Sequence, residues 1–273
     1  MRKIRLICLV LGAGILLAAV LAVNLCGSAA PTPEVIALDV GEGSATLIRT
    51  EAGCILIDAG PEDSQNRLCE RLYRLGVRSL ALVIFTHPDE DHIGGGDGIL
   101  RRFPTEEIWT NGEAADSDSY AALLRAAKTV PVRAVTAGER RTVGEASVTV
   151  LSPDADMAGS ENENSLVLSV ELAGHRLLIM GDAGEETENR LLNLAAGTDR
   201  LRADILFAGH HGANGSCGAE FLAAVAPEQI VISCGADNPY GHPDGRALER
   251  MRAVCGDIRR TDLAGDIHLD FSE

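Results

Sequence analysis

Short apolar runs alternate with amphipathic stretches along most of the chain. Runs of four to eight residues rich in Val, Ile and Leu predict β-strands, and stretches with apolar residues near i, i+3, i+4 and i+7 predict helices. The predicted strands are VIALDV, ATLIRT, CILIDA, LALVIFT, EIWT, PVRAV, SVTVLS, SLVLSVEL, HRLLIM, ADILFAG, QIVISCG and DIHLDF. The predicted helices cover residues 65–75, 93–102, 117–128, 185–195, 218–226 and 245–254.

Two features of this alternation indicate the fold class. The opening strands are joined by the glycine-containing turns GEGS and EAGC, which are typical of antiparallel hairpins. Single strands then alternate with helices in both halves of the chain, as expected for sheets whose outer faces are covered by helices. The pattern therefore predicts an α/β sandwich.

The first 30 residues differ in composition from the rest. MRKIR carries three positive charges, and LICLVLGAGILLAAVLAVNL follows with about twenty uncharged residues, enough to cross a bilayer. Because basic flanks stay in the cytoplasm, everything after this segment is expected outside it. We interpret residues 1–30 as a transmembrane anchor or a cleaved signal peptide with a short linker, its length favouring the anchor, and residues 31–273 as one domain.

Charge and cysteine content narrow the function. The chain has 24 basic and 40 acidic residues, a formal charge of −16, and without the three basic residues of MRKIR the charge is −19. The electrostatic field of so acidic a protein repels polyanions at long range, which argues against a nonspecific nucleic-acid binder. Local basic patches or bound cations can still make the potential positive at one site. The seven cysteines form no C-x-x-C pair and predict neither a disulfide framework nor a zinc finger.

The segment THPDEDHIGGG, residues 86–96, places two histidines and three carboxylates directly after the apolar run LALVIF. In extended backbone alternate side chains point the same way, so His87, Asp89 and Asp91 converge on one side and His92 points elsewhere. This geometry suits two adjacent cation sites, one at His87 and Asp89 and one at Asp91 and His92. An isolated HPD would instead be read as a solvated acidic loop.

The same arrangement recurs at three other strand ends. Asp182 follows the apolar run in LLIMGDAGEE, His210 and His211 follow it in ILFAGHHGANGS, and His242 lies in NPYGHPDG after QIVISCG. Open α/β folds build their sites where strand ends meet at one edge. The four segments together therefore predict a shared metal site.

These segments resemble the metallo-β-lactamase superfamily and, within it, the hydrolase domain of ComEC-type competence proteins. The resemblance is carried by LDVGEGSATLI, ILIDAG, FTHPDEDHIGG, ENENSLVL, LLIMGD, AGHHGANGS, YGHP and RTDLAGDI, in family order from residue 38 to 267. It implies a four-layered αββα sandwich with metals between the sheet edges. The chain departs from the usual pattern at Asp89, where a histidine is common outside the ComEC type. It departs also at the third motif, where ENENS offers Asn164 and Ser165 instead of a histidine.

The resemblance also implies a set of metal ligands. His87, Asp89 and Asp182 would hold the first ion. The second would lie among Asp91, His92, Asp182 and one of the two histidines of GHHG, with Asp182 bridging. Whether His210 or His211 coordinates stays open, and the other histidine would orient it or contact substrate.

Further residues are assigned to catalysis and substrate binding. Asp58, at the end of ILIDAG, resembles the aspartate that fixes ligand orientation in the superfamily, and with Asp91 and His242 it forms the predicted catalytic set. His242 is expected to contact substrate, protonate a leaving group, or coordinate a metal directly. The candidate substrate contacts are Asn164, Asn214, Ser216 and His242, of which Asn214 and Ser216 could instead form a turn. His175 and His268 receive no site role.

Aspartates beside imidazoles form an oxygen-rich site suited to two divalent ions, Zn²⁺ or Mn²⁺, which can supply a nucleophilic water at neutral pH. We therefore predict an extracytoplasmic, membrane-anchored or secreted hydrolase, a phosphodiesterase or nuclease acting on DNA or an envelope phosphodiester. The alternatives are a lactonase or β-lactamase acting on a carbonyl substrate, and a noncatalytic metal-binding surface module. We expect the N-terminal segment to attach the protein to the membrane, and no obligate protein partner is evident.

Overall fold

A computed structural model describes residues 33–156 and 159–271. The anchor or signal segment predicted at residues 1–30 lies outside these residues. Within the two described ranges, no helix is both long and apolar enough to span a membrane.

Two seven-stranded sheets form the centre of the fold. The first has the strand order β14-β1-β2-β3-β4-β5-β6 and the second the order β13-β12-β11-β10-β9-β8-β7. The strands of the first sheet are β1 (Glu34–Ala37), β2 (Thr46–Thr50), β3 (Gly53–Ile57), β4 (Leu82–Phe85), β5 (Ile108–Thr110), β6 (Val132–Ala134) and β14 (Ile267–Asp270). The strands of the second are β7 (Arg140–Val143), β8 (Ala146–Ser152), β9 (Val167–Leu172), β10 (His175–Ile179), β11 (Ile205–Phe207), β12 (Gln229–Ile232) and β13 (Asp257–Arg260).

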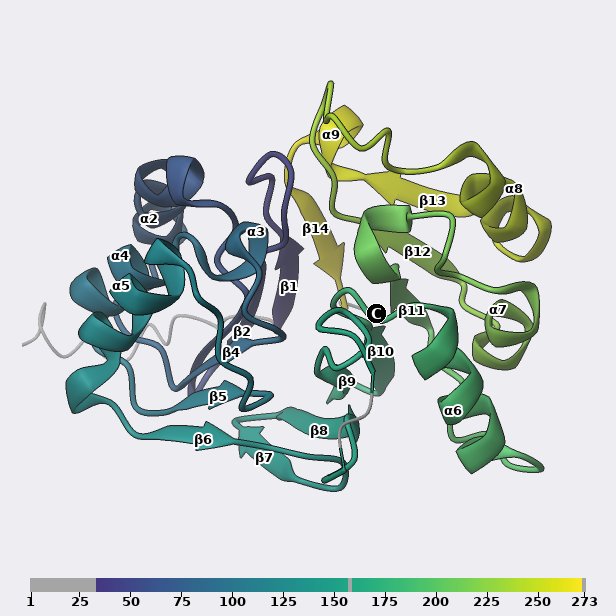
Figure 1. The fold of residues 1–273 in the computed structure, drawn as a ribbon, viewed down its shortest axis with the longest axis horizontal. Helices are drawn as coiled ribbons and strands as arrows, with labels where there is room; N and C mark the ends of the chain where they lie inside the picture. Colours follow the sequence, from purple (N-terminus) through teal and green to yellow (C-terminus); the bar gives the residue numbers. More distant parts are fainter. Residues whose placement is uncertain (1–32, 157–158, 272–273) are drawn as a thin grey trace, which may run out of the picture. The chain divides into compact units, whose positions relative to one another are not determined.

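Helices cover the outer face of each sheet (Figure 1), so the predicted four-layered αββα sandwich is confirmed. On the first sheet lie α2 (Gln65–Arg74), α4 (Gly96–Arg102) and α5 (Asp118–Ala126), and on the second α6 (Glu185–Ala195), α7 (Ala219–Val225) and α8 (Gly245–Val254). The short elements are α3 (Glu90–Ile93), α9 (Thr261–Ala264), η1 (Glu62–Ser64), η2 (Ala127–Thr129) and η3 (Gly209–Gly212).

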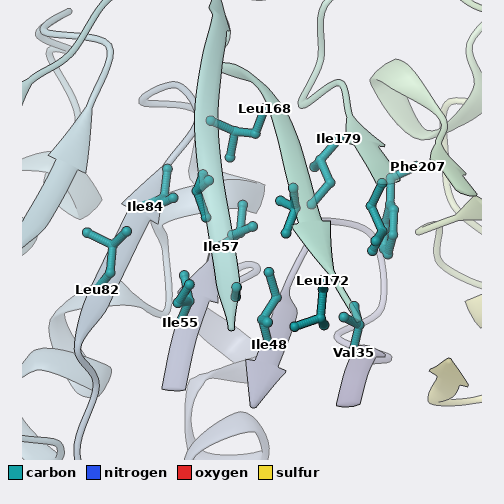
Figure 2. Close-up of a cluster of buried hydrophobic side chains, with 14 of the residues drawn as sticks. Val35, Ile48, Ile55, Ile57, Leu82, Ile84, Leu168, Leu172, Ile179 and Phe207 are labelled. Carbon is teal, nitrogen blue, oxygen red and sulfur yellow. The ribbon is translucent and has the colours of Figure 1, made fainter. Parts of the chain in front are cut away.

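The alternation of side chains along each strand builds three apolar layers. Ile55 and Ile57 of β3 face the second sheet, where they meet side chains such as Leu168 (Figure 2). The intervening Leu56 points the other way and packs with Leu72 of α2. All five side chains are buried, and full burial of one such side chain contributes about 1.5–3 kcal/mol. The rigid double sheet produced in this way holds the loops at its edge.

Strand direction determines which loops share that edge. The pairs β1–β2 and β2–β3 are antiparallel, as the glycine turns predicted, whereas β3–β4, β10–β11 and β11–β12 are parallel. Each of the twelve predicted strands and six predicted helical stretches corresponds to an observed element. The strands β7 and β13 were missed, because their sequences RRTV and DIRR are mostly polar and lie at an edge of the second sheet.

Candidate metal centre

The histidine- and aspartate-bearing segments lie at the carboxyl ends of four strands. Residues 86–92 follow β4, Asp182 follows β10, His211 follows β11, and His242 lies in the segment after β12. Their side chains meet between the two sheets' edges, as the distances below show. Strand ends of open sheets are the usual position of sites in α/β folds, so the structure brings together the segments that the sequence pattern singled out.

One group of ligand atoms contains Asp91, His92 and His211. His211 Nε2 lies 3.0 Å from Asp91 Oδ2 and 3.4 Å from His92 Nε2. Asp182 joins this group through Oδ1, which lies 3.0 Å from His92 Nε2 and 3.5 Å from His211 Nε2. Asp182 therefore lies beside both imidazoles, and we call Asp91, His92, His211 and Asp182 the second group.

Another set of mutually close ligand atoms comes from His87, His92 and Asp182. We call His87, Asp182 and the neighbouring Asp89 the first group. His87 Nε2 lies 3.4 Å from Asp89 Oδ2 and 3.9 Å from Asp182 Oδ2. His87 Nε2 and Asp182 Oδ1 are buried without a hydrogen-bond partner. Because an unpaired buried polar atom costs free energy, these atoms fit a site that is completed by a cation. Asp182 contributes one oxygen to each group.

The carboxylates and imidazoles of the second group shift one another's pKa values. Burial would raise the pKa of Asp182, but the neighbouring His92 and His211 outweigh it and hold that pKa well below its ordinary value. Against burial, the charge of Asp182 and the contact with Asp91 raise the pKa of His211 to about 9. The aspartates thus stabilise positive charge at the imidazoles, and a divalent cation would take the place of those protons.

Two hydrogen bonds set the tautomers of the ligand histidines. His92 Nδ1 lies 2.8 Å from Asp58 Oδ2, and His211 Nδ1 lies 2.8 Å from the carbonyl oxygen of Ser233. Carboxylates and carbonyls only accept, so both Nδ1 atoms donate and both Nε2 atoms are free to bind a cation. Asp58 also accepts from the amide of Thr86 at 2.8 Å and from its hydroxyl.

The GHHG segment separates the two consecutive imidazoles. His210 and His211 both adopt left-handed backbone, at φ 48° and 52°, a conformation that costs free energy for residues other than glycine. It places His211 Nε2 toward Asp182 Oδ1, whereas His210 Nε2 lies 3.8 Å from Asp182 Oδ2 and 3.3 Å from Asn162 Nδ2. Of the two, His211 therefore belongs to the second group, and His210 faces the other oxygen of Asp182.

His242 lies beside this group without entering it. Its ring centroid is 5.4 Å from that of His210 and 6.2 Å from that of His211. Its Nδ1 is 3.5 Å from Glu42 Oε1, and both atoms are buried without a hydrogen-bond partner. The position suits a substrate contact better than a metal ligand. Sequence patterns did not single out Glu42, which follows β1 in the stretch LDVGEGS.

The other predicted substrate contacts have different partners in the structure. The Asn164 side chain donates to the carbonyl of Gly159, and Ser216 donates to the carbonyl of Gly209. The Asn214 carbonyl accepts from Arg250. These polar groups stabilise the loops around the site, and nothing in the described residues directs them to the metal groups. A buried residue that the sequence analysis missed is Thr86, whose hydroxyl contacts both Asp58 and the ring nitrogens of the neighbouring histidines.

A cavity of about 680 Å³ adjoins the two groups. Asp89 and Asp91 form part of its wall, and Arg67 of α2 and the 72% exposed Tyr240 lie elsewhere on its lining. Among the described residues, Arg67 forms no ion pair within 4.0 Å. The cavity therefore offers a free guanidinium next to the candidate metal centre.

The fold and this site define the class of protein. The family model of the metallo-beta-lactamase superfamily matches residues 38–236, and the chain belongs to this superfamily. ComE operon protein 3 of Bacillus subtilis is 29% identical over 258 residues, covering 87% of this chain and 33% of that protein. Competence protein ComA of Neisseria gonorrhoeae is 31% identical over 232 residues, covering 85% of this chain and 31% of that protein.

Both relatives are ComEC-type competence proteins, as the sequence motifs predicted, and the chain spans about a third of their length. Among solved structures, the metallo-beta-lactamase fold protein YhfI of Bacillus subtilis has a TM-score of 0.58 at 11% identity, covering 87% of this chain and 99% of that one. Zn²⁺-bound PqqB of Methylobacterium extorquens has a TM-score of 0.56 at 16% identity, with the same coverage. These similarities show the fold.

Proposed function

We propose that this protein is an extracytoplasmic hydrolase that uses two divalent ions, Zn²⁺ or Mn²⁺, to cleave phosphodiesters in DNA or in the cell envelope. In this proposal residues 31–273 form the hydrolase domain, and residues 1–30 anchor or export it. The observation that carries the proposal is the cluster of buried imidazoles and carboxylates around Asp182, in which His87, His92 and Asp182 form one set of mutually close ligand atoms and Asp91, His92 and His211 form another.

His87, Asp89 and Asp182 would hold one ion, and Asp91, His92, His211 and Asp182 the other. When bound, divalent ions supply an ionised water and neutralise charge that develops on the substrate. The protein's own side chains fix the ligands, because Asp58 and the Ser233 carbonyl orient His92 and His211. These contacts hold the donor atoms in place before a substrate arrives.

Arg67 is the basic group in the adjoining cavity, whose lining also carries Asp63, Glu42 and Glu90, and it supports a phosphodiester as the substrate. Guanidinium groups bind phosphate oxygens through paired hydrogen bonds, and Arg67 is free to do so. Glu42 and Glu90 line the same cavity, but each directs an oxygen to a backbone amide, Glu42 to Gly235 at 2.7 Å and Glu90 to Glu62 at 2.8 Å. The competence-protein relatives also support a nucleic-acid substrate.

His242 completes the proposal as a residue that contacts the substrate's leaving group. It lies next to His210 and His211, and the carboxylate of Glu42 is 3.5 Å from its Nδ1. That position directs its other ring nitrogen away from Glu42, so that Nε2 is available to give a proton to a departing oxygen.

The test compares substrate classes on the full chain, purified in detergent and loaded with Mn²⁺ or Zn²⁺. Bis(p-nitrophenyl) phosphate and fluorescent DNA report phosphodiester cleavage, and nitrocefin and a lactone report carbonyl hydrolysis. We expect turnover of a phosphodiester that Asp182→Ala abolishes. Turnover of nitrocefin or lactone alone would reassign the reaction, and stoichiometric metal without any turnover would make the protein a binding module.

A further inference from the structure

The ring of His87 needs a hydrogen-bond acceptor at Nδ1 if its Nε2 is to bind a cation. A neutral imidazole carries one hydrogen, so a hydrogen on Nδ1 leaves Nε2 with a free electron pair. His92 and His211 meet this condition through a carboxylate and a backbone carbonyl. His87 Nδ1 instead lies 3.2 Å from the hydroxyl of Thr86. Among the residues that the structure describes, this hydroxyl is the one hydrogen-bond partner of His87 Nδ1.

The single hydrogen of the Thr86 hydroxyl points to Asp58. The hydroxyl oxygen lies 2.9 Å from Asp58 Oδ2 and 3.1 Å from Asp58 Oδ1. A carboxylate only accepts, and hydrogen bonds to an ionised acceptor are about twice as strong as neutral ones. The hydroxyl therefore donates to Asp58, and its free electron pairs accept from His87 Nδ1. His92 does not compete for them, because its Nδ1 lies 2.8 Å from Asp58 but 3.3 Å from the Thr86 hydroxyl.

Contacts from both sheets hold Thr86 in place. Thr86 directly follows β4 and is completely buried. Its amide donates to Asp58, after β3, at 2.8 Å, and its carbonyl accepts from the amide of Leu166, before β9, at 2.9 Å. Gly181 packs so closely that a β-carbon there would lie 3.0 Å from Thr86 Cβ. A side chain enclosed in this way keeps its hydroxyl between the Asp58 carboxylate and the His87 ring.

We propose that Thr86 is the positioning residue of the first group, whose hydroxyl links the Asp58 carboxylate to His87 Nδ1 and leaves His87 Nε2 free for a cation. One carboxylate then orients two ligand histidines, His92 directly and His87 through the hydroxyl. His87 Nε2 is buried without a hydrogen-bond partner and lies 3.9 Å from Asp182 Oδ2, which suits an atom that is paired by a cation. This inference rests on the proposed metal-dependent function and adds to it a residue that does not itself bind metal.

The experiment measures metal affinity, because the hydroxyl acts on a ligand rather than on the substrate. The full chain, purified in detergent and stripped of metal, is titrated with Zn²⁺ against a chromophoric chelator, and elemental analysis gives the number of bound ions. Valine has nearly the shape of threonine but no hydroxyl. We expect Thr86→Val to bind one ion with wild-type affinity and the other about 10- to 100-fold more weakly, the usual effect of removing a hydrogen bond to a ligand histidine. Thr86→Ser keeps the hydroxyl and should bind both ions like wild type.

Two double variants identify the histidine through which the hydroxyl acts. In a His87→Ala chain, Thr86→Val should cause no further loss of affinity for either ion, because the ring that the hydroxyl orients is gone. In an Asp58→Asn chain, Thr86→Val should add its own loss. The asparagine oxygen still accepts from the Thr86 amide and hydroxyl, so Asp58→Asn by itself acts on His92.

Thr50→Val is the matched control. Thr50 is buried, and its hydroxyl donates to the carbonyl of Gly53 at 3.0 Å in the turn between β2 and β3, at the other end of β3 from Asp58. This variant should bind both ions with wild-type affinity. Circular dichroism verifies that each variant is folded, and Thr86→Ala replaces Thr86→Val if valine prevents folding.

Three results would overturn the proposal. They are wild-type affinity for both ions in folded Thr86→Val, an equal loss in Thr86→Ser or Thr50→Val, and a further loss when Thr86→Val is added to His87→Ala. A wild-type chain that binds no metal would overturn the proposed function itself, whereas the three preceding results leave that function intact.

Discussion

Replacement of Asp58 by asparagine tests how the tautomer of a ligand histidine controls metal binding. Asp58 is buried, and its carboxylate accepts from the Thr86 amide at 2.8 Å and from His92 Nδ1 at 2.8 Å. Asparagine has the same shape, and it tolerates the left-handed backbone that Asp58 adopts at φ 60°. The substitution therefore changes one hydrogen-bonding atom and little else.

The geometry dictates which atom changes. The asparagine oxygen must accept from the Thr86 amide, so its NH₂ group faces His92 Nδ1. Two donors cannot share a hydrogen bond, and His92 must move its proton to Nε2, the atom that faces Asp182 and the second group. A protonated Nε2 cannot bind a cation. We expect about 10- to 100-fold weaker metal binding at the second group, equivalent to about 1.4–2.8 kcal/mol.

Asp58→Ala should have a different effect, on stability as well as on metal binding. It leaves the Thr86 amide and His92 Nδ1 as buried donors without an acceptor. Each such donor costs about 1–3 kcal/mol, so the free energy of unfolding should fall by about 2–6 kcal/mol. Asp58→Asn retains the hydrogen bond to the Thr86 amide, so its free energy of unfolding should fall less than that of Asp58→Ala.

The assay is chelator competition for Zn²⁺ combined with urea denaturation, on wild type, Asp58→Asn, Asp58→Ala and the exposed control Asp116→Asn. Circular dichroism verifies that each variant is folded. Wild-type metal affinity in folded Asp58→Asn would refute the tautomer argument, because it would show that His92 binds its cation without the Asp58 carboxylate.

Three further predictions follow from the site. Asp182→Ala should lose most bound metal, as measured by elemental analysis, because both groups lose a carboxylate oxygen; full metal content would contradict the bridging position. Arg67→Ala should raise the KM for a phosphodiester but not for an uncharged lactone, whereas Arg74→Ala on the same helix should change neither. Metal-free protein should lose up to about 3 kcal/mol of stability between pH 6.5 and pH 9, because the pKa of His211 is raised to about 9 and its stabilising proton is lost over that range. Bound Zn²⁺ should remove this pH dependence of the melting temperature, and a flat profile without metal would contradict the assignment.

The pattern of apolar residues was enough to predict an α/β sandwich, and the family resemblance implied its four layers. Side chains alternate across a strand, so a run such as CILIDA indicates a buried strand without reference to the rest of the chain. The polar edge strands β7 and β13 carried no such signal, because their sequences RRTV and DIRR pack little apolar surface. Local periodicity therefore predicts the elements that supply the core and misses those held mainly by backbone pairing.

Sequence alone also indicated which segments carry the chemistry, because a histidine or aspartate directly after a buried strand must lie at the sheet edge. It could not choose between His210 and His211. That choice depends on two left-handed residues and on the Ser233 carbonyl, which approaches from the next strand. The contact between His92 and His211 joins residues 119 positions apart, so it exists only after both sheets have packed. The positions of histidines and aspartates in the sequence show which strands end at the site. The distances between their ligand atoms depend on how those strands and loops pack together.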